Sequence, residues 1–310
     1  MKYVYLDQNK WILLAGGWYG GEGEVYDLVC ELKKKIESKE VVVVVSLINL
    51  DETLKSRGEW RRNRLLEFIF ELSQGHTISP FRDWVIDDEV ENLFLEPLGK
   101  KINIQSKIIR RGVSGVIGME ASLKGDIPEE IKNKLIEKVN SLKTFKTIFS
   151  TPESMTQAKK YSSYVKKETH KFEDVRRKER FQKDKKLQFE TTLKNFFRDF
   201  ILWRGICFYF KYNLPIFRGD MGIKDLEDLM KKLPATYTYF SLEERRSRDL
   251  SRKIKANDLN DLMSFTMGIA YCDILFGEIM FVDIAKKSKL DKLYGTVITS
   301  SLEEFKKAIS

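Results

Sequence analysis

The sequence predicts an α/β protein, a doubly wound α/β/α domain with a parallel central sheet whose two halves are separated by a large helical insertion. Three observations predict this class. Strand and helix patterns alternate over residues 1–80 and again over residues 236–310. Val41 to Val45 is a run of five valines, which is typical of a strand buried on both faces of a parallel sheet. Residues 81–235 show helical patterns with little strand character, so we expect them to form the insertion.

The first half is expected to alternate between strands and helices. Apolar residues recur at helical spacing between Val25 and Ser38, and Ser46 is a favourable N-cap for the helix after the valine run. The expected elements, in order, are a strand over 2–7, helices over 8–18 and 25–38, a strand over 41–45, helices over 47–57 and 59–74, and a strand over 76–79.

The second half is expected to contain a helix over 256–270 and strands over 274–276 and 296–299. Within the insertion, we expect an aromatic-rich helix near residues 195–212. The insertion also has glycines at every third position without a preceding strand, which we interpret as a helix-packing or loop feature. These glycines are Gly112, Gly115 and Gly118.

The composition favours a soluble, cytoplasmic protein with no membrane partner. The chain has 310 residues, 42% of them hydrophobic, which is enough for a large core. Its N-terminus lacks a signal-peptide pattern, and its longest apolar stretches are too short or too interrupted by charge to span a bilayer. The cysteines Cys30, Cys207 and Cys272 are isolated and odd in number, which argues against a disulfide framework and against a Cys-x-x-Cys zinc site. Cys272 is expected to be buried.

The net charge of +9 is concentrated in one segment of the insertion. Between Met155 and Phe200 there are fourteen Lys or Arg residues against seven Asp or Glu, a local net charge of +7. A basic face with interleaved aromatic residues suits a polyanion such as RNA or DNA, although a solvated helical face laced with ion pairs has a similar composition. The candidates for direct phosphate contact are Arg176, Arg177, Lys178 and Arg180.

Acidic residues lie at or just after the ends of predicted strands in both halves of the chain. Asp7 closes the first strand, Glu52 lies on the helix after the second, and Glu278 follows the strand over 274–276. Asp273, at the entrance to that strand, is expected to be structural. The remaining acids of this group are Asp258 and Asp261 on the preceding helix. Because the carboxyl ends of parallel strands open into one crevice, we expect the carboxylates to converge, and carboxylates without a compensating cation favour a hard divalent ion.

Three segments resemble the acidic motifs of PIN-domain nucleases in their order, spacing and strand context. They are Tyr5-Leu6-Asp7-Gln8-Asn9, Ser46 to Glu52, and Asn257 to Asp261 followed by Ala270 to Glu278. The resemblance covers the two ends of the chain and implies a PIN-like fold and a nuclease dependent on Mg²⁺ or Mn²⁺. The residues it implies are Asp7, Glu52 and Asp261 as catalytic metal ligands, Glu278 and Asp258 as supporting acids, and Asn9 as the group that positions a water or phosphate. The chain departs from the family pattern at Gly277, where a small hydroxyl residue is usual, and at Glu278, where Asp is usual.

The same acidic residues also have structural interpretations. Asp7 alternatively caps the helix that follows it, and Asp258 alternatively caps the helix that carries Asp261. Glu52 and its neighbour Asp51 are alternatively ordinary exposed helix carboxylates.

The leading hypothesis is a metal-dependent endonuclease, acting on RNA rather than DNA, that grips its substrate with the basic insertion and serves, for example, as a toxin or defence effector. The alternative is a non-catalytic RNA- or DNA-binding protein with a degenerate PIN fold. A third hypothesis is that the insertion binds a protein partner, such as an inhibitor, or a second copy of the chain. The only histidines, His76 and His170, are far apart, which argues against a metal-free ribonuclease built on paired histidines.

Overall fold

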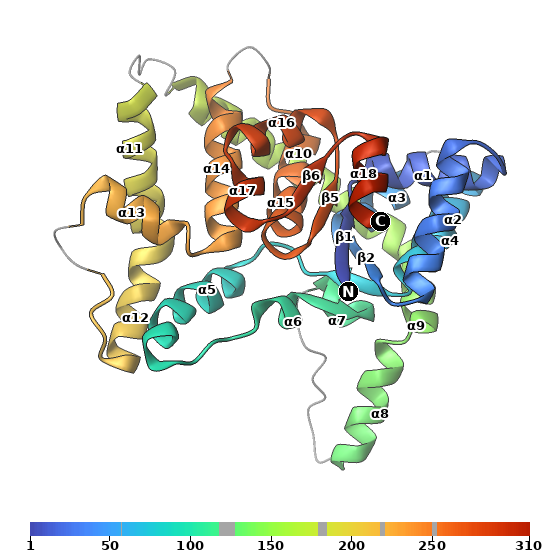
Figure 1. The fold of residues 1–310 in the computed structure, drawn as a ribbon, viewed down its shortest axis with the longest axis horizontal. Coiled ribbons are helices and arrows are strands. Elements are labelled where there is room, and N and C mark those ends of the chain that lie inside the picture. The colour runs from blue at the N-terminus through green and yellow to red at the C-terminus, as the bar shows by residue number, and fades with distance from the viewer. Residues whose placement is uncertain (57, 118–127, 179–184, 218–220, 250–252) are drawn as a thin grey trace.

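The structure is a computed structural model that describes residues 1–56, 58–117, 128–178, 185–217, 221–249 and 253–310 (Figure 1). The strands are β1 (Lys2–Leu6), β2 (Val41–Ser46), β3 (His76–Ile78), β4 (Ile109–Arg111), β5 (Ile274–Phe276) and β6 (Val297–Thr299). The helices of the two halves are α1 (Gln8–Gly20), α2 (Glu24–Glu37), α3 (Leu47–Lys55), α4 (Glu59–Ser73), α14 (Pro234–Arg248), α15 (Ala256–Tyr271), α16 (Ile279–Lys287), α17 (Leu290–Tyr294) and α18 (Leu302–Ile309). The helical elements between the halves are α5 (Asp83–Leu95), η1 (Glu96–Leu98), α6 (Ile104–Ile108), α7 (Gly112–Ile117), α8 (Glu129–Val139), α9 (Leu142–Phe149), α10 (Pro152–Lys178), α11 (Lys185–Phe196), the π-helical turn η3 (Phe197–Leu202), α12 (Trp203–Tyr212) and α13 (Ile223–Met230).

The six strands form one sheet in the order β4-β3-β2-β1-β5-β6. Every neighbouring pair is parallel except β3 and β4, which are antiparallel. The predicted α/β class and the parallel pairing of five strands are therefore confirmed, whereas the prediction of an entirely parallel sheet is wrong at one edge. Strand β4 was not predicted, because three residues inside a helical segment carry no period that distinguishes a strand.

The sheet separates two hydrophobic cores, one on each face. Along β1, Tyr5 points into one core, and Val4 and Leu6 point into the other. The valine run of β2 divides in the same way, so that every residue of the strand is buried. This two-sided burial is the reason that an uninterrupted β-branched sequence, and not an alternating one, forms the centre of the sheet.

The segment predicted as an insertion contributes to both cores. Val85, Val90 and Phe94 of α5 are fully buried in the core shared with α14, α15 and α16, and Phe145 of α9 is fully buried in the opposite core. Figure 1 shows α2 and α4 on one side of β1 and β2, and α14 to α17 on the other. Helix α10 packs against α3 and α15, which carry Glu52 and Asp261.

Two of the three regularly spaced glycines serve close packing. Gly112 has a φ of +72°, and a Cβ at this position would lie 2.3 Å from the backbone oxygen of Asn140. A Cβ at Gly115 would lie 2.0 Å from Oγ1 of Thr77. These contacts confirm a packing role for both, while Gly118 lies outside the described residues. Within the described part of the chain, no helix has the length and apolar character needed to cross a membrane.

Candidate acidic site at the carboxyl edge of the sheet

The topology places the site between β1 and β5. The chain runs outward from β1 through β2 to β3 on one side of the sheet, and β5 and β6 lie on the other, so the strand order reverses beside β1. Such a reversal opens a crevice at the carboxyl ends of the strands. Asp7 follows β1 directly and Glu278 follows β5 after one glycine, and the Asp7 backbone nitrogen donates to the Phe276 carbonyl over 3.0 Å.

Asp7 is both a helix cap and an uncompensated acid. Its Oδ1 accepts a hydrogen bond from the Gln8 backbone nitrogen over 2.7 Å, so it is the N-cap of α1, as one of its two interpretations predicted. Its Oδ2 is buried and has no hydrogen-bond partner. Burial raises the pKa of Asp7 to about 6, and the nearby charge of Glu278 adds to the effect. One carboxylate oxygen therefore remains available for a ligand.

Glu52 is directed toward the site by the start of α3. The Ser46 and Asn49 side chains cap each other's backbone nitrogens and fix the first turn, and Glu52 lies in the next turn. Asn260 of α15 donates from Nδ2 to Oε1 of Glu52 over 3.3 Å. Burial raises the pKa of Glu52 to about 7, with a further contribution from the charge of Asp7. Glu52 is partly buried, so its interpretation as an ordinary exposed carboxylate is wrong.

Asp261 shows that the acids share one environment. It lies on α15, one residue after Asn260, and its pKa is raised to about 9. Burial is the main cause, and the charges of Asp7, Glu52 and Glu278 follow in that order. Acids from three other parts of the chain are thus close enough to raise the proton affinity of Asp261. We call Asp7, Glu52, Asp261 and Glu278 the acidic site.

Asp258 already has a cation. Its Oδ2 accepts hydrogen bonds from Nη2 and Nε of Arg246 over 2.6 and 3.1 Å, and from the Lys255 backbone nitrogen over 3.1 Å. The Arg246 and Asp258 side chains are both buried, 5% and 3% exposed. Asp258 therefore caps α15 from its first turn and ties α15 to α14, and we leave it out of the proposed ligand set.

Asn9 and Lys10 complete the surroundings of the site. Asn9 is exposed on the first turn of α1, and its Nδ2 lies 3.4 Å from Oε2 of Glu278. Lys10 donates to the Ser300 carbonyl over 2.8 Å, and its Nζ lies 4.2 Å from the centroid of the Phe276 ring. Partial burial lowers the pKa of Lys10, while the charge of Asp7 opposes this effect. Lys10 thus holds a positive charge beside Asp7.

Sequence reasoning missed Lys10, Asn260 and Arg246. Lys10 had a detectable signal, because it lies three residues after Asp7 on a predicted helix and therefore on the same face. Asn260 had no such signal, since its partner Glu52 lies 208 residues away. Arg246 is one of several basic residues in a helical run, and nothing local marks it as the buried one.

The other acidic and imidazole side chains have structural roles. Asp51 is buried and paired with Lys55, so the prediction that it is exposed is wrong. Asp273 accepts a hydrogen bond from the Tyr3 backbone nitrogen over 2.7 Å. It lies at the opposite, amino edge of the sheet, as its structural interpretation predicted. His76 accepts a hydrogen bond from Nε of Arg111 over 3.2 Å.

The acidic site is not arranged as a ligand shell. Among the described residues, no group of three or more His, Cys, Asp or Glu side chains is placed to hold a metal ion. The donor chemistry nevertheless fits a hard divalent cation, because Oδ2 of Asp7 is buried without a partner and every member of the site offers carboxylate oxygen. The residues are therefore suited to such an ion in type and position, and would have to draw together to bind it.

Comparisons of the chain with protein-family models, with curated proteins and with solved structures found no match.

Exposed cations lie beside the acidic site on α10. The side chains of Arg176, Arg177 and Lys178 at the end of this helix, and all of Arg180, lie outside the described residues. Buried side chains recur along α10 at helical spacing, at Ala158, Val165, Thr169 and Glu173. The opposite face exposes Lys159, Lys160, Lys166, Lys167 and His170. We call these four lysines the α10 lysine face.

An aromatic and arginine cluster lies at the far end of α1. The Arg64 guanidinium lies 4.6 Å from the ring centroid of Tyr19 and 4.1 Å from that of Trp60. Trp60 is 64% exposed and Tyr19 is 39% exposed. A tryptophan this exposed adds little to the core, so its ring is open to a ligand. Sequence reasoning did not single out this cluster, because its members come from two different helices.

Proposed function

We propose that this chain is a metal-dependent, PIN-like endonuclease that hydrolyses phosphodiester bonds, with RNA favoured over DNA. One observation carries the proposal, the convergence of four carboxylates from four elements at the topological reversal of the sheet. Among the described residues, none of the four forms an ion pair with a lysine or arginine. Partly buried acids that lie close together raise one another's pKa, and a divalent ion offsets that repulsion.

Asp7, Glu52 and Asp261 would hold the ion, with Glu278 as a supporting acid. When bound, Mg²⁺ or Mn²⁺ lowers the pKa of a water and stabilises charge on the leaving oxygen of a phosphodiester. Oδ2 of Asp7, which has no hydrogen-bond partner in the protein, would be its oxygen toward the ion. Lys10 supplies positive charge beside Asp7, and the exposed Asn9 amide is a donor for a phosphate oxygen.

Two surfaces on elements that border or extend from the acidic site support a nucleic-acid substrate. The α10 lysine face lies on a helix that packs against α3 and α15, and lysines bind phosphates with little dependence on sequence. The Tyr19–Arg64–Trp60 cluster lies at the end of α1, the helix that Asp7 caps, about 18 Å along its axis from Asp7 at 1.5 Å per residue. Exposed aromatic rings stack on unpaired bases, which favours single-stranded RNA.

A non-catalytic nucleic-acid-binding protein is the second candidate. The arrangement of the acids without a formed ligand shell favours it, as does the departure from the family pattern at Gly277 and Glu278. This candidate keeps the lysine and aromatic surfaces and gives the carboxylates no chemical role.

The test is cleavage of a panel of single-stranded and structured RNAs in Mn²⁺, Mg²⁺ or EDTA. The purified chain is compared with Asp7→Asn, Glu52→Gln and the control Glu37→Gln, an exposed acid at the end of α2 that precedes the amino end of β2. The proposal requires cleavage that depends on metal, is lost in both site variants and is kept in the control. RNA binding without cleavage in every metal would favour the non-catalytic candidate.

A further inference from the structure

A cavity of about 870 Å³ lies at the amino edge of the sheet, away from the acidic site. Cys272 and Asp273 at its wall precede β5, and Thr296 precedes β6, whereas the acidic site follows the carboxyl ends of the strands. The remaining walls come from α5, the start of α6, the segment 99–103, the start of α14 and α17. Its volume is in the range of cavities that hold small organic ligands.

The polar groups at the base of the cavity are already satisfied within the protein. Glu89 is 1% exposed and accepts hydrogen bonds from the Ala235 nitrogen at 2.6 Å, the Thr236 nitrogen at 3.0 Å, the Thr236 hydroxyl at 2.6 Å and the Tyr271 hydroxyl at 2.5 Å. The Tyr294 hydroxyl donates to the Lys231 carbonyl over 3.2 Å. Both tyrosine hydroxyls thus already have a partner within the protein, which leaves the rings as the groups available to a ligand.

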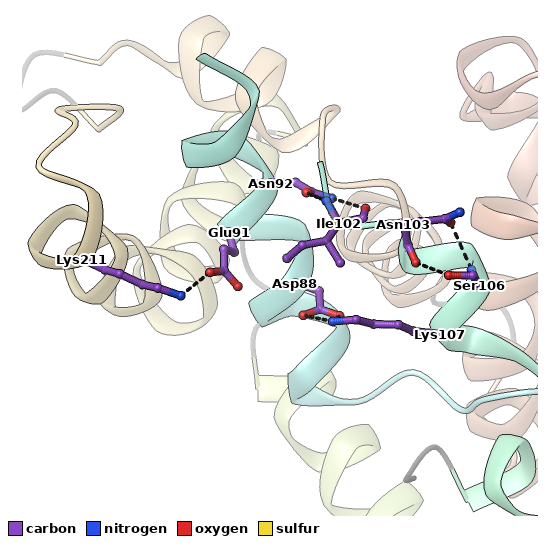
Figure 2. Close-up of polar contacts among 8 residues, drawn as sticks. All are labelled: Asp88, Glu91, Asn92, Ile102, Asn103, Ser106, Lys107 and Lys211. Carbon is purple, nitrogen blue, oxygen red and sulfur yellow. Dashed lines mark hydrogen bonds and ion pairs between the residues drawn. The ribbon is translucent and has the colours of Figure 1, made fainter. Parts of the chain in front are cut away.

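The wall facing these rings is also rigid. Asn92 of α5 donates a hydrogen bond from Nδ2 to the Ile102 carbonyl over 3.1 Å. Its Oδ1 accepts a hydrogen bond from the Ile102 backbone nitrogen over 2.7 Å (Figure 2). Lys107 of α6 bonds both carboxylate oxygens of Asp88 over 3.1 and 2.9 Å (Figure 2). The segment 99–103 is thus held to α5 in a fixed position, so the cavity is preformed.

Two lysines at the mouth of the cavity lack a charged partner among the described residues. Lys100 and Lys101 are exposed on the segment 99–103 and line the cavity, and within the described residues neither has a hydrogen-bond or ion-pair partner. Of the three acids that line the cavity, Glu96 lies 3.7 Å from Lys232, Glu89 is fully hydrogen bonded, and Asp273, at the foot of β5, accepts a hydrogen bond from the Tyr3 backbone nitrogen. Two adjacent ammonium groups without a counterion attract an anion.

We propose that this cavity binds a small aromatic anion of the mononucleotide class. A planar base would lie against the rings of Tyr271 and Tyr294, among the apolar side chains of Leu93, Ile104 and Pro234. The phosphate would lie at the mouth between Lys100 and Lys101. The walls combine these apolar and aromatic side chains with polar and charged groups, and a ligand with a planar ring and an anionic group needs both.

Isothermal titration calorimetry of the full chain in EDTA tests the proposal, because the acidic site is then without metal. The probes are the four common nucleoside monophosphates, the corresponding nucleosides and inorganic phosphate. The expected result is binding of at least one monophosphate, with its nucleoside and inorganic phosphate each weaker by about tenfold or more. Equal binding of inorganic phosphate alone would show a simple anion site and overturn the proposal, as would no binding of any monophosphate.

Variants place the binding in this cavity. The double charge reversal Lys100→Glu with Lys101→Glu is expected to lower the affinity for the monophosphate by about tenfold or more, since two phosphate contacts become repulsive. The matched control is Lys306→Glu with Lys307→Glu, two exposed lysines of α18, which should leave the affinity unchanged. Tyr294→Ala should lower the affinity for the monophosphate and leave the weak affinity for inorganic phosphate unchanged. An affinity that survives the Lys100 and Lys101 reversal would overturn the assignment whatever the outcome of the RNA cleavage test.

Discussion

At the residue scale, single side chains of the acidic site serve both the fold and the proposed chemistry. Asp7 caps α1 with one oxygen and keeps the other buried and unpartnered. Its position was predictable, because an acid that ends an apolar strand before a helix pattern is visible in the sequence. The side chains around it, Asn260 and Lys10, were not predicted, because they reach the site through the tertiary arrangement of the helices.

The raised pKa values predict the pH dependence of stability in the absence of metal. Asp7, Glu52 and Asp261 have folded pKa values of about 6, 7 and 9, all above the unfolded values near 4. The folded state therefore binds more protons, so stability is greatest in acid and falls as pH rises through these values. Each extra bound proton contributes a slope of about 1.4 kcal/mol per pH unit.

Urea unfolding in EDTA between about pH 5 and about pH 8 measures this slope. Asp261→Asn should flatten it, because the variant lacks the most strongly perturbed acid and relieves the others. Glu37→Gln should leave it unchanged. A free energy of unfolding that rises over this interval in the unaltered chain would contradict the electrostatic coupling of the site.

The buried Arg246–Asp258 pair predicts a large effect of one substitution. Arg246→Ala removes the guanidinium from the buried Asp258 carboxylate, and losing one partner of a buried pair costs about 3–5 kcal/mol. Urea unfolding at neutral pH measures the loss. Arg245→Ala, on the exposed neighbour in α14, is the matched control. A loss no larger than that of the control would show that the pair is not buried as described.

Gly277, where PIN-domain nucleases usually carry a small hydroxyl residue, has a packing reason of its own. A Cβ at this position would lie 2.3 Å from Cζ of Phe265, whose side chain is fully buried. Gly277→Ser should therefore destabilise the fold by about 1–3 kcal/mol by overpacking. The double variant with Phe265→Leu should recover part of that loss in the same unfolding measurement. An unchanged free energy of unfolding in Gly277→Ser would contradict the packing explanation.

At the element scale, the regular elements of the two halves were largely predictable. The five valines predicted strand β2, and apolar residues at helical spacing predicted α2, because burial imposes those periods on the sequence. The antiparallel edge strand β4 and the short helices α16 to α18 were not among the expected elements. Three to nine residues are too few for a period to stand out, and their positions depend on packing against the completed sheet.

Helix α10 predicts an electrostatic effect on RNA binding. Lys159→Glu with Lys166→Glu alters two members of the α10 lysine face while the buried face of the helix stays intact. Affinity for single-stranded RNA should fall. The slope of log K against log salt should become less steep, by the amount expected for about two lost phosphate contacts. Filter binding over a salt series measures both. Lys306→Glu with Lys307→Glu should change neither, and an equal loss in that control would mean only that net charge matters.

At the scale of the whole molecule, the sheet has two functional edges in this account. The carboxyl edge gathers the acidic site, and the amino edge lines the cavity beside Lys100 and Lys101. Helix α15 runs between them, with Asp261 near its start and Tyr271 at its end. The sequence indicated the first edge through its acids at strand ends. It gave no sign of the second, because the cavity is assembled from five separate stretches of chain.

The four members of the acidic site are proposed to bind one divalent cation together. This is tested by calorimetric titration of Mn²⁺ into the metal-free chain, with Asp7→Asn and Glu52→Gln as site variants and Glu37→Gln as control. We expect binding to the unaltered chain and to the control, and an affinity lower by about tenfold or more in each site variant. Absence of Mn²⁺ binding to the unaltered chain, or equal binding to both site variants, would contradict the claim.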